Sequence, residues 1–380
     1  MPRILHVSQP VDGGVARVVT ELAAAQAAAG MDVHVACPAE GPLPRALGAA
    51  GRGVRGHPWA ASRSPGPGLR TEVAELHRVI DAVRPTLVHA HSAKAGLAAR
   101  LALRGRVPTV FQPHAWSFEA VGGSTALLAR FWERRAARWT DRVVCVSEAE
   151  WITGRRAGIP GSYVVVPNGV DVDRFSPGAA RQARDRLLPT AFARAPLVVC
   201  VGRLCRQKGQ DVLLRAWTSV AARVPGARLV LVGDGPDAGR LRAGAEASVT
   251  FAGAARETAD WYRAADVVVL PSRWEGMALA PLEAMACGRP VVVTDVNGAR
   301  ESLPSAGRAH GLVPPEDPAA LARALVALLR DAELRDALGR RGRRHVLDHH
   351  DARRTADAID VVYRELLGAA PTKYRECTTT

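Results

Sequence analysis

The sequence predicts an α/β fold made of two doubly wound parallel-sheet domains that face each other across a cleft. Short apolar runs alternate with Ala- and Leu-rich helical stretches, and this series breaks once and starts again. The length of 380 residues suits two or three domains at roughly 100 to 200 residues each. A composition that is 48% hydrophobic and 23% charged supplies ordinary cores and excludes a disordered chain.

Apolar runs in the first half have the character of buried strands. They lie at residues 4–8, 32–36, 86–91, 109–112, 142–147 and 162–167. Runs that are apolar without polar alternation are typical of strands buried on both faces. We therefore expect a parallel sheet with helices on either side.

The pattern breaks at residues 176–196, which are rich in Pro, Gly and polar side chains. A second series of strands follows at residues 197–202, 228–233, 248–253, 266–271 and 289–295. These features predict an N-terminal domain of residues 1–178 and a C-terminal domain of residues 195–350. Helical periodicity at 351–370 predicts a C-terminal helix that can pack back on the N-terminal domain.

The composition also narrows the partners and the compartment. The 51 Lys and Arg residues exceed the 37 Asp and Glu residues, which gives a net charge of +14. Two explanations stay open: a coding bias toward Arg, or attraction to phosphate or to an anionic membrane face. The six cysteines contain no CxxC pair, which is typical of buried thiols in a reducing compartment. Since no apolar run approaches the roughly 18 residues of a membrane span, we expect a cytoplasmic protein.

The first candidate ligand-binding motif follows the first strand. Gly13 and Gly14 open a helix there, where glycine lets a ligand approach the backbone and the helix N-terminus attracts an anion. Such a turn is common in α/β proteins, so alone it indicates little. Neither it nor Gly233-Asp234-Gly235 fits GxGxxG, which argues against a nicotinamide enzyme.

Charged residues follow two strands of the second domain, where ligands of doubly wound sheets bind. Arg203 and Lys208 lie five residues apart on a glycine-bounded loop and suit a diphosphate, with a solvated basic loop as the alternative. Glu275 stands beside Gly276 after the strand DVVVL, and Glu283 comes eight residues later. Two such carboxylates can accept hydrogen bonds from the hydroxyl groups of one extended ligand. The helix dipole explains Glu283 alone as an exposed acid, but it does not explain Glu275.

In their order, the motifs of this chain resemble those of the retaining glycosyltransferases of family 4. They are GGVAR near the start, PNGVDVDRF at 167–175, VGRLCRQKGQDVLL, LVGDGP, two glutamates separated by seven residues, and HGLVPPEDPAALARAL at 310–325. The resemblance covers most of the chain, and the block 271–290 is highly specific. It implies the GT-B architecture of two Rossmann-like domains. It also implies a hexosyltransferase that moves a sugar from a nucleotide-diphosphate sugar to a hydroxyl acceptor with retention of configuration.

The resemblance implies roles for residues of the second domain. Arg203 and Lys208 match the pair that binds the donor diphosphate, and Glu283 matches the carboxylate that holds the ribose hydroxyls. The contact to the donor sugar hydroxyls is matched by Glu275 with the backbone of Gly276, Met277 and Ala278. One departure lies nearby, because Asn297-Gly298 stands where the family usually has two glycines.

In the first domain the resemblance implies two contacts. Gly14 matches the phosphate-side backbone, and His114 matches the histidine on the acceptor-side domain, where Ala115 replaces the usual glycine. A hydrogen-bonded loop histidine is the alternative for His114, while His89 and His91 fit structural roles. The residues after His114 predict an apolar mobile loop formed by Trp116, Phe118 and Val121.

A site of this kind breaks a sugar–phosphate bond by stabilising charge on the leaving diphosphate. Preorganised Arg203, Lys208 and helix-terminal N–H groups would do this without a metal. No carboxylate pair fits a nucleophile with an acid, and Asp171-Val172-Asp173 fits a turn. We therefore expect no metal, no cofactor, and an acceptor that attacks from the side the diphosphate leaves. The candidate catalytic residues are His114, Arg203, Lys208 and Glu275.

The acceptor side is less defined, and a glycan, a lipid-linked glycan or a small glycoside would fit. A predicted helix at 126–139 carries Arg130, Arg134 and Arg138 on one face. That face either lies on anionic lipid at the inner face of a membrane or is only solvated. A nucleotide-sugar epimerase or a phosphorylase on the same scaffold is the alternative function. Nucleic acid is not expected as a partner, because no interleaved aromatic residues or Lys-rich stripe accompany the charge.

Overall fold

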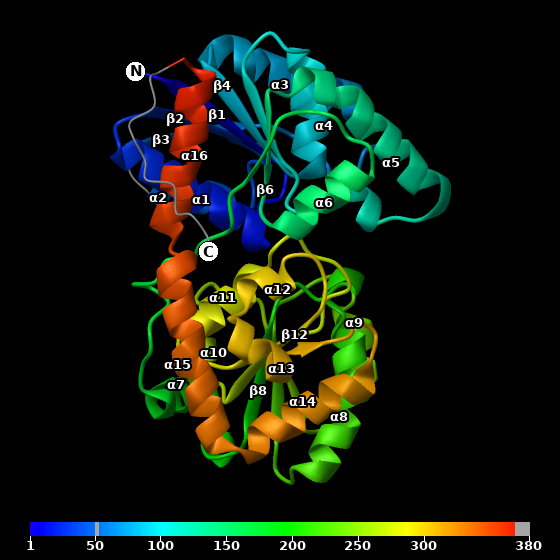
Figure 1. Cartoon of the computed structure of the whole chain (residues 1–380), viewed down its shortest axis with the longest axis vertical. Coiled ribbons are helices and arrows are strands. Elements are labelled where there is room, and N and C mark those ends of the chain that lie inside the picture. The colour runs from blue at the N-terminus through cyan, green and yellow to red at the C-terminus, as the bar shows by residue number, and fades with distance from the viewer. Residues whose placement is uncertain (50–52, 369–380) are drawn as a thin grey trace. The chain divides into compact units, whose positions relative to one another are not determined.

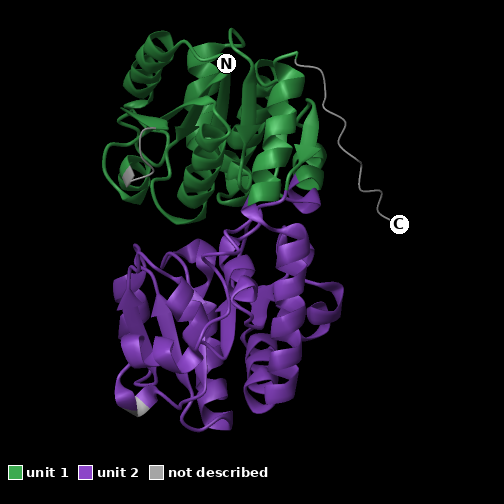
Figure 2. Ribbon diagram, turned by 90° about the vertical axis from the view of Figure 1, so that its left-hand side faces the viewer, with its two compact units in different colours: residues 1–146, 151–166, 353–380 green, residues 147–150, 167–352 purple. Residues whose placement is uncertain are grey.

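The computed structural model describes residues 1–49 and 53–368, which form two compact units (Figures 1 and 2). Of the described residues, unit 1, green in Figure 2, contains 1–49, 53–146, 151–166 and 353–368. Unit 2, purple in the same figure, contains residues 147–150 and 167–352. Residues 369 and 370, at the end of the predicted C-terminal helix, lie outside the described residues.

Unit 1 is built on a parallel sheet with the strand order β3-β2-β1-β4-β5-β6-β7. Its strands are β1 (Arg3–Ser8), β2 (Asp32–Cys37), β3 (Val54–Pro58), β4 (Leu87–His91), β5 (Thr109–Gln112), β6 (Arg142–Cys145) and β7 (Tyr163–Val165). The order runs outward in both directions from β1 and β4. This neighbouring pair is therefore the topological switch point of the sheet, where ligands of doubly wound folds bind.

Helices cover both faces of this sheet. They are α1 (Gly13–Ala28), α2 (Pro42–Ala49), α3 (Leu69–Val83), α4 (Ser92–Leu103), α5 (Gly123–Ala136), α6 (Glu148–Arg156) and α16 (Ala352–Leu366), with 3-10 turns η1 (Ser117–Glu119) and η2 (Ala137–Trp139). Because successive residues of a strand point to opposite faces, Leu5 packs with α3 and α4, whereas Ile4 packs with Ile359 and Tyr363 of α16. His6, two residues after Ile4, shares the face that α16 covers.

Unit 2 repeats this architecture with the order β10-β9-β8-β11-β12-β13, again all parallel. Its strands are β8 (Leu197–Val201), β9 (Arg228–Val232), β10 (Val249–Gly253), β11 (Val267–Leu270), β12 (Val291–Thr294) and β13 (Leu312–Val313). The switch point lies between β8 and β11. The loops after these two strands should therefore form the ligand site of this unit.

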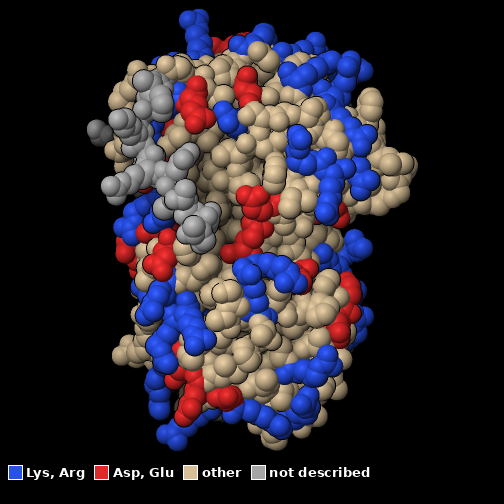
Figure 3. Space-filling view, viewed as in Figure 1, with Lys and Arg blue, Asp and Glu red and all other residues tan. Residues whose placement is uncertain are grey.

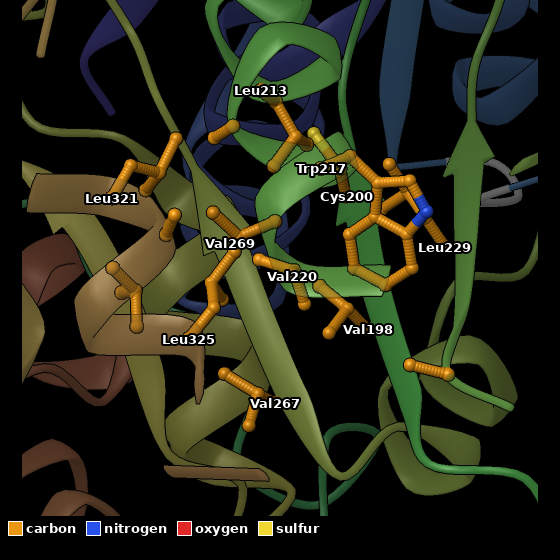
Figure 4. Packing of buried hydrophobic residues seen from close by; sticks show 14 of the residues in the cluster. Val198, Cys200, Leu213, Trp217, Val220, Leu229, Val267, Val269, Leu321 and Leu325 are labelled. Carbon is orange, nitrogen blue, oxygen red and sulfur yellow. The ribbon is translucent and has the colours of Figure 1, made fainter. Parts of the chain in front are cut away.

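The helices of unit 2 enclose one large apolar core. They are α7 (Ala180–Leu187), α8 (Gln210–Arg223), α9 (Ala238–Ala243), α10 (Ala259–Ala264), α11 (Leu279–Ala286), α12 (Ala299–Ser302), α13 (Arg308–Gly311), α14 (Pro318–Arg330) and α15 (Ala332–His349), with 3-10 turns η3 (Thr190–Phe192), η4 (Arg206–Lys208) and η5 (Ser305–Gly307). Figure 4 shows Trp217 of α8 among Val198, Leu229 and neighbouring aliphatic side chains. Its indole N–H still reaches a partner, donating to Ser248 Oγ at 2.9 Å.

Some features of the fold have no counterpart in the sequence prediction. Strand β3 lies at the sheet edge, and no apolar run marks it because Arg55 and Gly56 are exposed. Segment 176–196, where the pattern breaks, contains α7. The Arg184 guanidinium of this helix donates to Ala264 O at 2.7 Å and pairs with Asp266 at 2.9 Å.

The cysteines and the helix lengths bear on the predicted compartment. Cys37, Cys200 and Cys287 are buried, and burial raises the pKa of the Cys37 thiol to about 11. Cys205 is partly exposed, and Cys377 lies outside the described residues. Within residues 1–49 and 53–368, no helix combines the length and the apolar character needed to cross a bilayer.

Candidate functional site

Two predicted site residues meet at the switch point of unit 2. Lys208 ends the loop after β8, Glu275 lies on the loop after β11, and Lys208 Nζ is 2.5 Å from Glu275 Oε1. Ser272 Oγ donates to the same carboxylate oxygen at 2.7 Å. Glu275 is only 8% exposed, so its charge is held among fixed partners rather than solvated. An ammonium and a carboxylate therefore stand side by side where a ligand should bind.

Arg273 fixes the positions of these two loops relative to each other. Its backbone N–H donates to Gln207 O at 2.7 Å, and the Gln207 side chain donates to Trp274 O at 3.0 Å. Its guanidinium forms two hydrogen bonds of 2.8 Å with the Asp211 carboxylate on α8. These bonds hold the pKa of Asp211 below its ordinary value. Arg273 thus acts as a structural clamp, and the Lys208–Glu275 geometry is preorganised.

Glycine is required at two points of this arrangement. Gly209, between η4 and α8, has φ of 65°, and a Cβ there would lie 2.0 Å from Pro271 O. Gly298 has φ of 74°, and a Cβ there would lie 2.0 Å from Gly276 O. Both contacts join loops that follow neighbouring strands. Of the pair Asn297-Gly298, where the family usually has two glycines, the second position is the one that the backbone demands.

The segment Gly276 to Ala278 presents its backbone to the site. Its carbonyl groups are used by the protein: Ser147 Oγ donates to Gly276 O at 3.0 Å, and Asn168 Nδ2 donates to Met277 O at 2.8 Å. Among the described residues, the N–H groups of Gly276 and Met277 have no acceptor. They precede the N-terminus of α11, so this segment is suited to binding an anionic or hydroxyl-bearing ligand. A small hollow at this place is lined by residues that include Ser272, Glu275, Ala278 and Asn297.

The remaining predicted residues of unit 2 are placed differently. Arg203 is partly exposed, and its guanidinium makes no ion pair with any residue that the structure describes. Glu283 lies in α11 and is 2% exposed, with Tyr262 OH donating to Glu283 Oε2 at 2.6 Å. The explanation of Glu283 as an exposed helix-start acid is therefore wrong. Its carboxylate is buried and oriented by a tyrosine that is itself 0% exposed.

In unit 1 the predicted residues follow β1 and β5. Gly14 is exposed in the first turn of α1, next to Gly13 with its φ of 72°. His114 is partly exposed, and burial of its ring lowers the pKa of His114 to about 3. Its φ is 55° and that of Ala115 is 107°, both in the left-handed region. A β-carbon is disfavoured there, which is why glycine is the usual residue at position 115 and why this turn is strained.

Several supporting residues were not identified from the sequence. Ser272 and Tyr262 orient the two glutamates, and the only sequence signal was that Ser272 directly follows a strand. In unit 1, His91 Nδ1 lies 3.2 Å from His114 Nε2, a contact that the structural role expected for His91 does not predict. The missing signal was spatial, because β4 and β5 become neighbours only in the folded sheet.

The predicted mobile loop after His114 is wrong. Trp116 is 1% exposed and Phe118 is 5% exposed, and their rings stack with centroids 5.7 Å apart. The Trp116 ring fills the space beside Gly154 of α6, where a Cβ would lie 2.5 Å from it. These aromatic residues belong to the core. Of the three predicted loop residues, Val121 is the exposed one, at 41%.

A cluster of exposed apolar side chains in unit 1 lies instead on α5. Leu127, Leu128 and Phe131 are each about two thirds exposed, at 65%, 67% and 64%. Figure 3 shows this part of the surface as an uncharged area with Lys and Arg side chains beside it. The three predicted arginines also contact the protein. Arg134 Nε donates to Ala157 O at 2.7 Å, Arg130 lies 5.2 Å over the Phe118 ring, and Arg138 lies 4.3 Å over the Trp139 ring.

Comparison with known proteins identifies the family. Residues 12–174 match the sequence profile described as Glycosyltransferase Family 4, and residues 195–331 match that of glycosyl transferases group 1. D-inositol 3-phosphate glycosyltransferase 2 of Catenulispora acidiphila is 33% identical over 81% of this chain and 76% of its own length. The chain belongs to glycosyltransferase family 4. It is an enzyme that uses nucleotide-sugar donors.

Two further likenesses support the activity and the fold of this glycosyltransferase. The GDP-mannose-dependent alpha-(1-6)-phosphatidylinositol monomannoside mannosyltransferase of Mycobacterium tuberculosis is 34% identical over 78% of this chain and 80% of its own. The solved structure of sucrose-phosphate synthase from Thermosynechococcus elongatus matches with a TM-score of 0.82 at 25% identity, over 97% of this chain and 100% of that one. The predicted family and GT-B fold are confirmed.

Proposed function

We propose that this glycosyltransferase moves a sugar, with retained anomeric configuration and without a metal, from a nucleoside-diphosphate sugar to a hydroxyl of a lipid-linked acceptor. The observation that carries the donor side is the Lys208–Glu275 pair at the switch point of unit 2. In this pair, the Lys208 ammonium can bind a phosphate, and the Glu275 carboxylate beside it can accept a hydrogen bond from a sugar hydroxyl. Arg203, with no ion pair to any described residue, supplies a second cation for the diphosphate.

The ion pair can exchange partners when the donor binds. Lys208 Nζ turns to a diphosphate oxygen, while Glu275 keeps its bond from Ser272 and accepts another from a sugar hydroxyl. The N–H groups of Gly276 and Met277 add neutral donors to the same ligand. Glu283, oriented by Tyr262, accepts from the ribose hydroxyls.

This arrangement favours attack from the face that the diphosphate leaves. Preorganised cations stabilise the negative charge that builds on the leaving group, which is usually the largest single contribution to such a reaction. With the donor bound, Glu275 accepts from Ser272 and from a sugar hydroxyl, and Glu283 accepts from Tyr262 and from the ribose, so neither is poised as a nucleophile on the opposite face. Because burial keeps the His114 pKa low, its neutral ring is assigned to the hydroxyl of the acceptor.

The stereochemistry and the role of metal can be tested together. Thermal stabilisation by a panel of nucleotide sugars identifies the donor, because a ligand that binds only the folded state raises its stability. Proton spectra of the transfer product then report the linkage. We expect the donor's anomeric configuration and unchanged activity with a chelator. An inverted linkage contradicts the mechanism, and so does loss of activity with chelator that a divalent ion restores.

The lipid-linked acceptor is proposed from the surface of α5. Three large apolar side chains, Leu127, Leu128 and Phe131, are about two thirds exposed within two turns of one helix. The last turn of this helix carries Arg134 and Arg135. An apolar patch bordered by cations suits the interface of an anionic membrane, where side chains insert and cations contact headgroups.

Vesicle sedimentation tests this surface. We expect wild-type protein to bind vesicles that contain phosphatidylglycerol, and replacement of Leu127, Leu128 and Phe131 by Ser to reduce that binding about tenfold or more. Leu347→Ser is the matched control, because Leu347 is an exposed leucine of a different helix, at 41%. Equal binding by the triple variant and the control would contradict membrane docking by α5.

A further inference from the structure

A continuous chain of hydrogen-bonded side chains leads to His114 through the interior of unit 1. Asp360 Oδ1 on α16 lies 3.3 Å from Gln26 Nε2 of α1, and Gln26 Oε1 lies 2.8 Å from His6 Nε2. His6 Nδ1 lies 3.0 Å from His91 Nε2, and His91 Nδ1 lies 3.2 Å from His114 Nε2. Gln26, His6 and His91 are each 0% exposed, whereas Asp360 and His114 are partly exposed. This chain of hydrogen bonds therefore connects two partly exposed residues of unit 1, Asp360 and His114.

The histidine rings of this chain point at one another. The ring centroids are 5.3 Å apart for His6 and His91 and 5.5 Å apart for His91 and His114, with the planes 29° and 24° apart. In each pair, the distance between the ring centres equals the distance between the two facing nitrogens plus about one ring radius on either side. The two ring centres and the two nitrogens therefore lie nearly on one line. The N–H of one ring therefore faces the lone pair of the next, as in a hydrogen bond.

This geometry argues against a metal in the same cluster. His6, His89 and His91 are buried with candidate ligand atoms within 4.8 Å of one another, which is the composition of a metal site. A metal requires lone pairs that converge on one point outside the rings. Here the His6 and His91 nitrogens face each other, and His89 Nδ1 lies 2.7 Å from Tyr363 OH. The cluster is better described as a hydrogen-bonded network.

The carboxylate at the far end gives the chain a direction. Burial raises the pKa of Asp360, and the hydrogen bond from Gln26 opposes that rise. In its ionised form Asp360 can only accept, so Gln26 presents its amide N–H to Asp360 and its carbonyl oxygen to His6. His6 then carries its proton on Nε2 and leaves Nδ1 as an acceptor. The same reasoning puts the proton of His91 on Nε2, and then that of His114 on Nε2. Each ring fixes the tautomer of the next.

The rings are neutral, as this reasoning requires. Burial lowers the pKa of His6 to about 4 and that of His114 to about 3, and it lowers the pKa of His91 well below its ordinary value. A neutral imidazole has one donor and one acceptor nitrogen, so the position of one proton decides both.

We propose that Asp360 sets the tautomer of His114 through Gln26, His6 and His91, so that His114 presents an unprotonated Nδ1. That nitrogen accepts a hydrogen bond from the acceptor hydroxyl and orients its oxygen lone pairs for attack. Asp360 is thus a positioning residue, which acts from a helix at the other end of the sequence. The role in transfer rests on the proposed function of His114, but the tautomer itself does not.

The tautomers can be read directly. In protein with isotope-labelled histidine, long-range nitrogen–proton correlation spectra show which ring nitrogen carries the proton, and single-histidine variants assign the signals. We expect Nε2–H for His6, His91 and His114 in the wild-type protein. Protonation of wild-type His114 on Nδ1 would overturn the proposal without any variant.

Two substitutions of Asp360 test its control of the chain. The amide of Asp360→Asn can donate to Gln26, which then turns and reverses every bond, so the Nδ1–H form of His114 should increase. Asp360→Glu keeps an acceptor and should restore the wild-type tautomer. Asp357→Asn is the matched control, because it makes the same chemical change at an exposed position of α16. A His114 spectrum that responds equally to both Asn variants overturns the proposal.

Turnover separates this proposal from the proposed function. In Asp360→Asn we expect kcat to fall about tenfold, with the donor KM unchanged. This is less than the hundredfold or more that loss of a positioned acid–base group causes, because the His114 ring itself is kept. Asp360→Glu should recover most of that loss. A changed tautomer with unchanged kcat would support the chain and contradict the role of His114 in transfer. An unchanged tautomer with reduced kcat would contradict the chain.

Discussion

The two switch points of this glycosyltransferase occupy the same place in the same fold and hold different chemistry. In unit 2 the polar groups stand on loops beyond β8 and β11, and they are charged, with Lys208 against Glu275. In unit 1 they stand on β1 and β4 themselves, and His6 and His91 are neutral. A charge on a residue of a buried strand has a large desolvation free energy, whereas a charge on a loop residue can keep polar partners or solvent. Position in the sheet thus separates the charged residues that we propose bind a diphosphate from the neutral residues that we propose act on a hydroxyl.

The largest expected effect is on the charged switch point. Arg203→Ala or Lys208→Ala should lower turnover about a hundredfold or more, the scale that follows from losing one preorganised charge-stabilising group. Arg206→Ala is the matched control on the same loop, because Arg206 is exposed and lies 5.6 Å over the Trp274 ring. Steady-state kinetics measure the difference. Turnover that is equal in all three variants would remove the diphosphate assignment.

A smaller effect should distinguish the two glutamates. Glu283→Gln should weaken binding of the free nucleoside diphosphate about tenfold, since the hydrogen bond from Tyr262 no longer orients a charged acceptor for the ribose hydroxyls. Glu275→Gln should leave that affinity nearly unchanged and lower sugar-dependent turnover instead. Calorimetry with the nucleotide, together with kinetics, separates the two. If both variants lose nucleotide affinity equally, the proposed division is contradicted.

The sequence predicted the sheets better than the sites within them. Apolar runs, interrupted in unit 1 only by histidines, located both strands of each switch point, because burial on two faces leaves a pattern that neighbouring residues alone can show. The edge strand β3 left no such pattern. Lys208 and Glu275 were both found after strands. Their contact with each other and with Ser272 depends on loop geometry that Arg273 and Gly209 impose.

The histidine chain could not be predicted for a different reason. His6 and His91 are 85 residues apart and meet because β1 and β4 pair, a choice that no local pattern encodes. Asp360 and Gln26 are 334 residues apart and meet because α16 covers the same face of the sheet. Isolated histidines in apolar strands resemble satisfied core residues. Their order in a network is visible only after the whole unit is assembled.

Acid should act on the two units unequally. Burial lowers histidine pKa values at six described positions of unit 1 and at two of unit 2, namely His6, His34, His57, His89, His91 and His114 against His345 and His350. In the unfolded chain these residues titrate near an ordinary pKa of about 6.5. As pH falls from about 6.5 toward 4, the unfolded state therefore binds more protons than the folded one. The free energy of unfolding should fall over this window.

Unit 1 should lose protection first over that range. Hydrogen-exchange mass spectrometry at pH 7 and pH 5, corrected for the intrinsic exchange rate, compares β4 in unit 1 with β8 in unit 2. We expect β4 peptides to gain exchange while β8 peptides change less. The reverse order would show that the buried histidines do not govern acid stability.

The smallest expected effect is at the strained turn of the neutral switch point. Ala115 has φ of 107°, where a β-carbon costs roughly 1 to 2 kcal/mol, so Ala115→Gly should relieve strain. Greater freedom of glycine in the unfolded chain offsets part of that gain, which leaves about 0.5 to 1 kcal/mol and a rise in Tm of about 2 °C. Ala120→Gly is the matched control, because Ala120 is exposed with an ordinary φ of −82° and should be slightly destabilised instead. Calorimetry of both variants gives the sign. If Ala115→Gly lowers Tm as Ala120→Gly does, the turn is not strained, and the usual glycine of the family serves another purpose at this position.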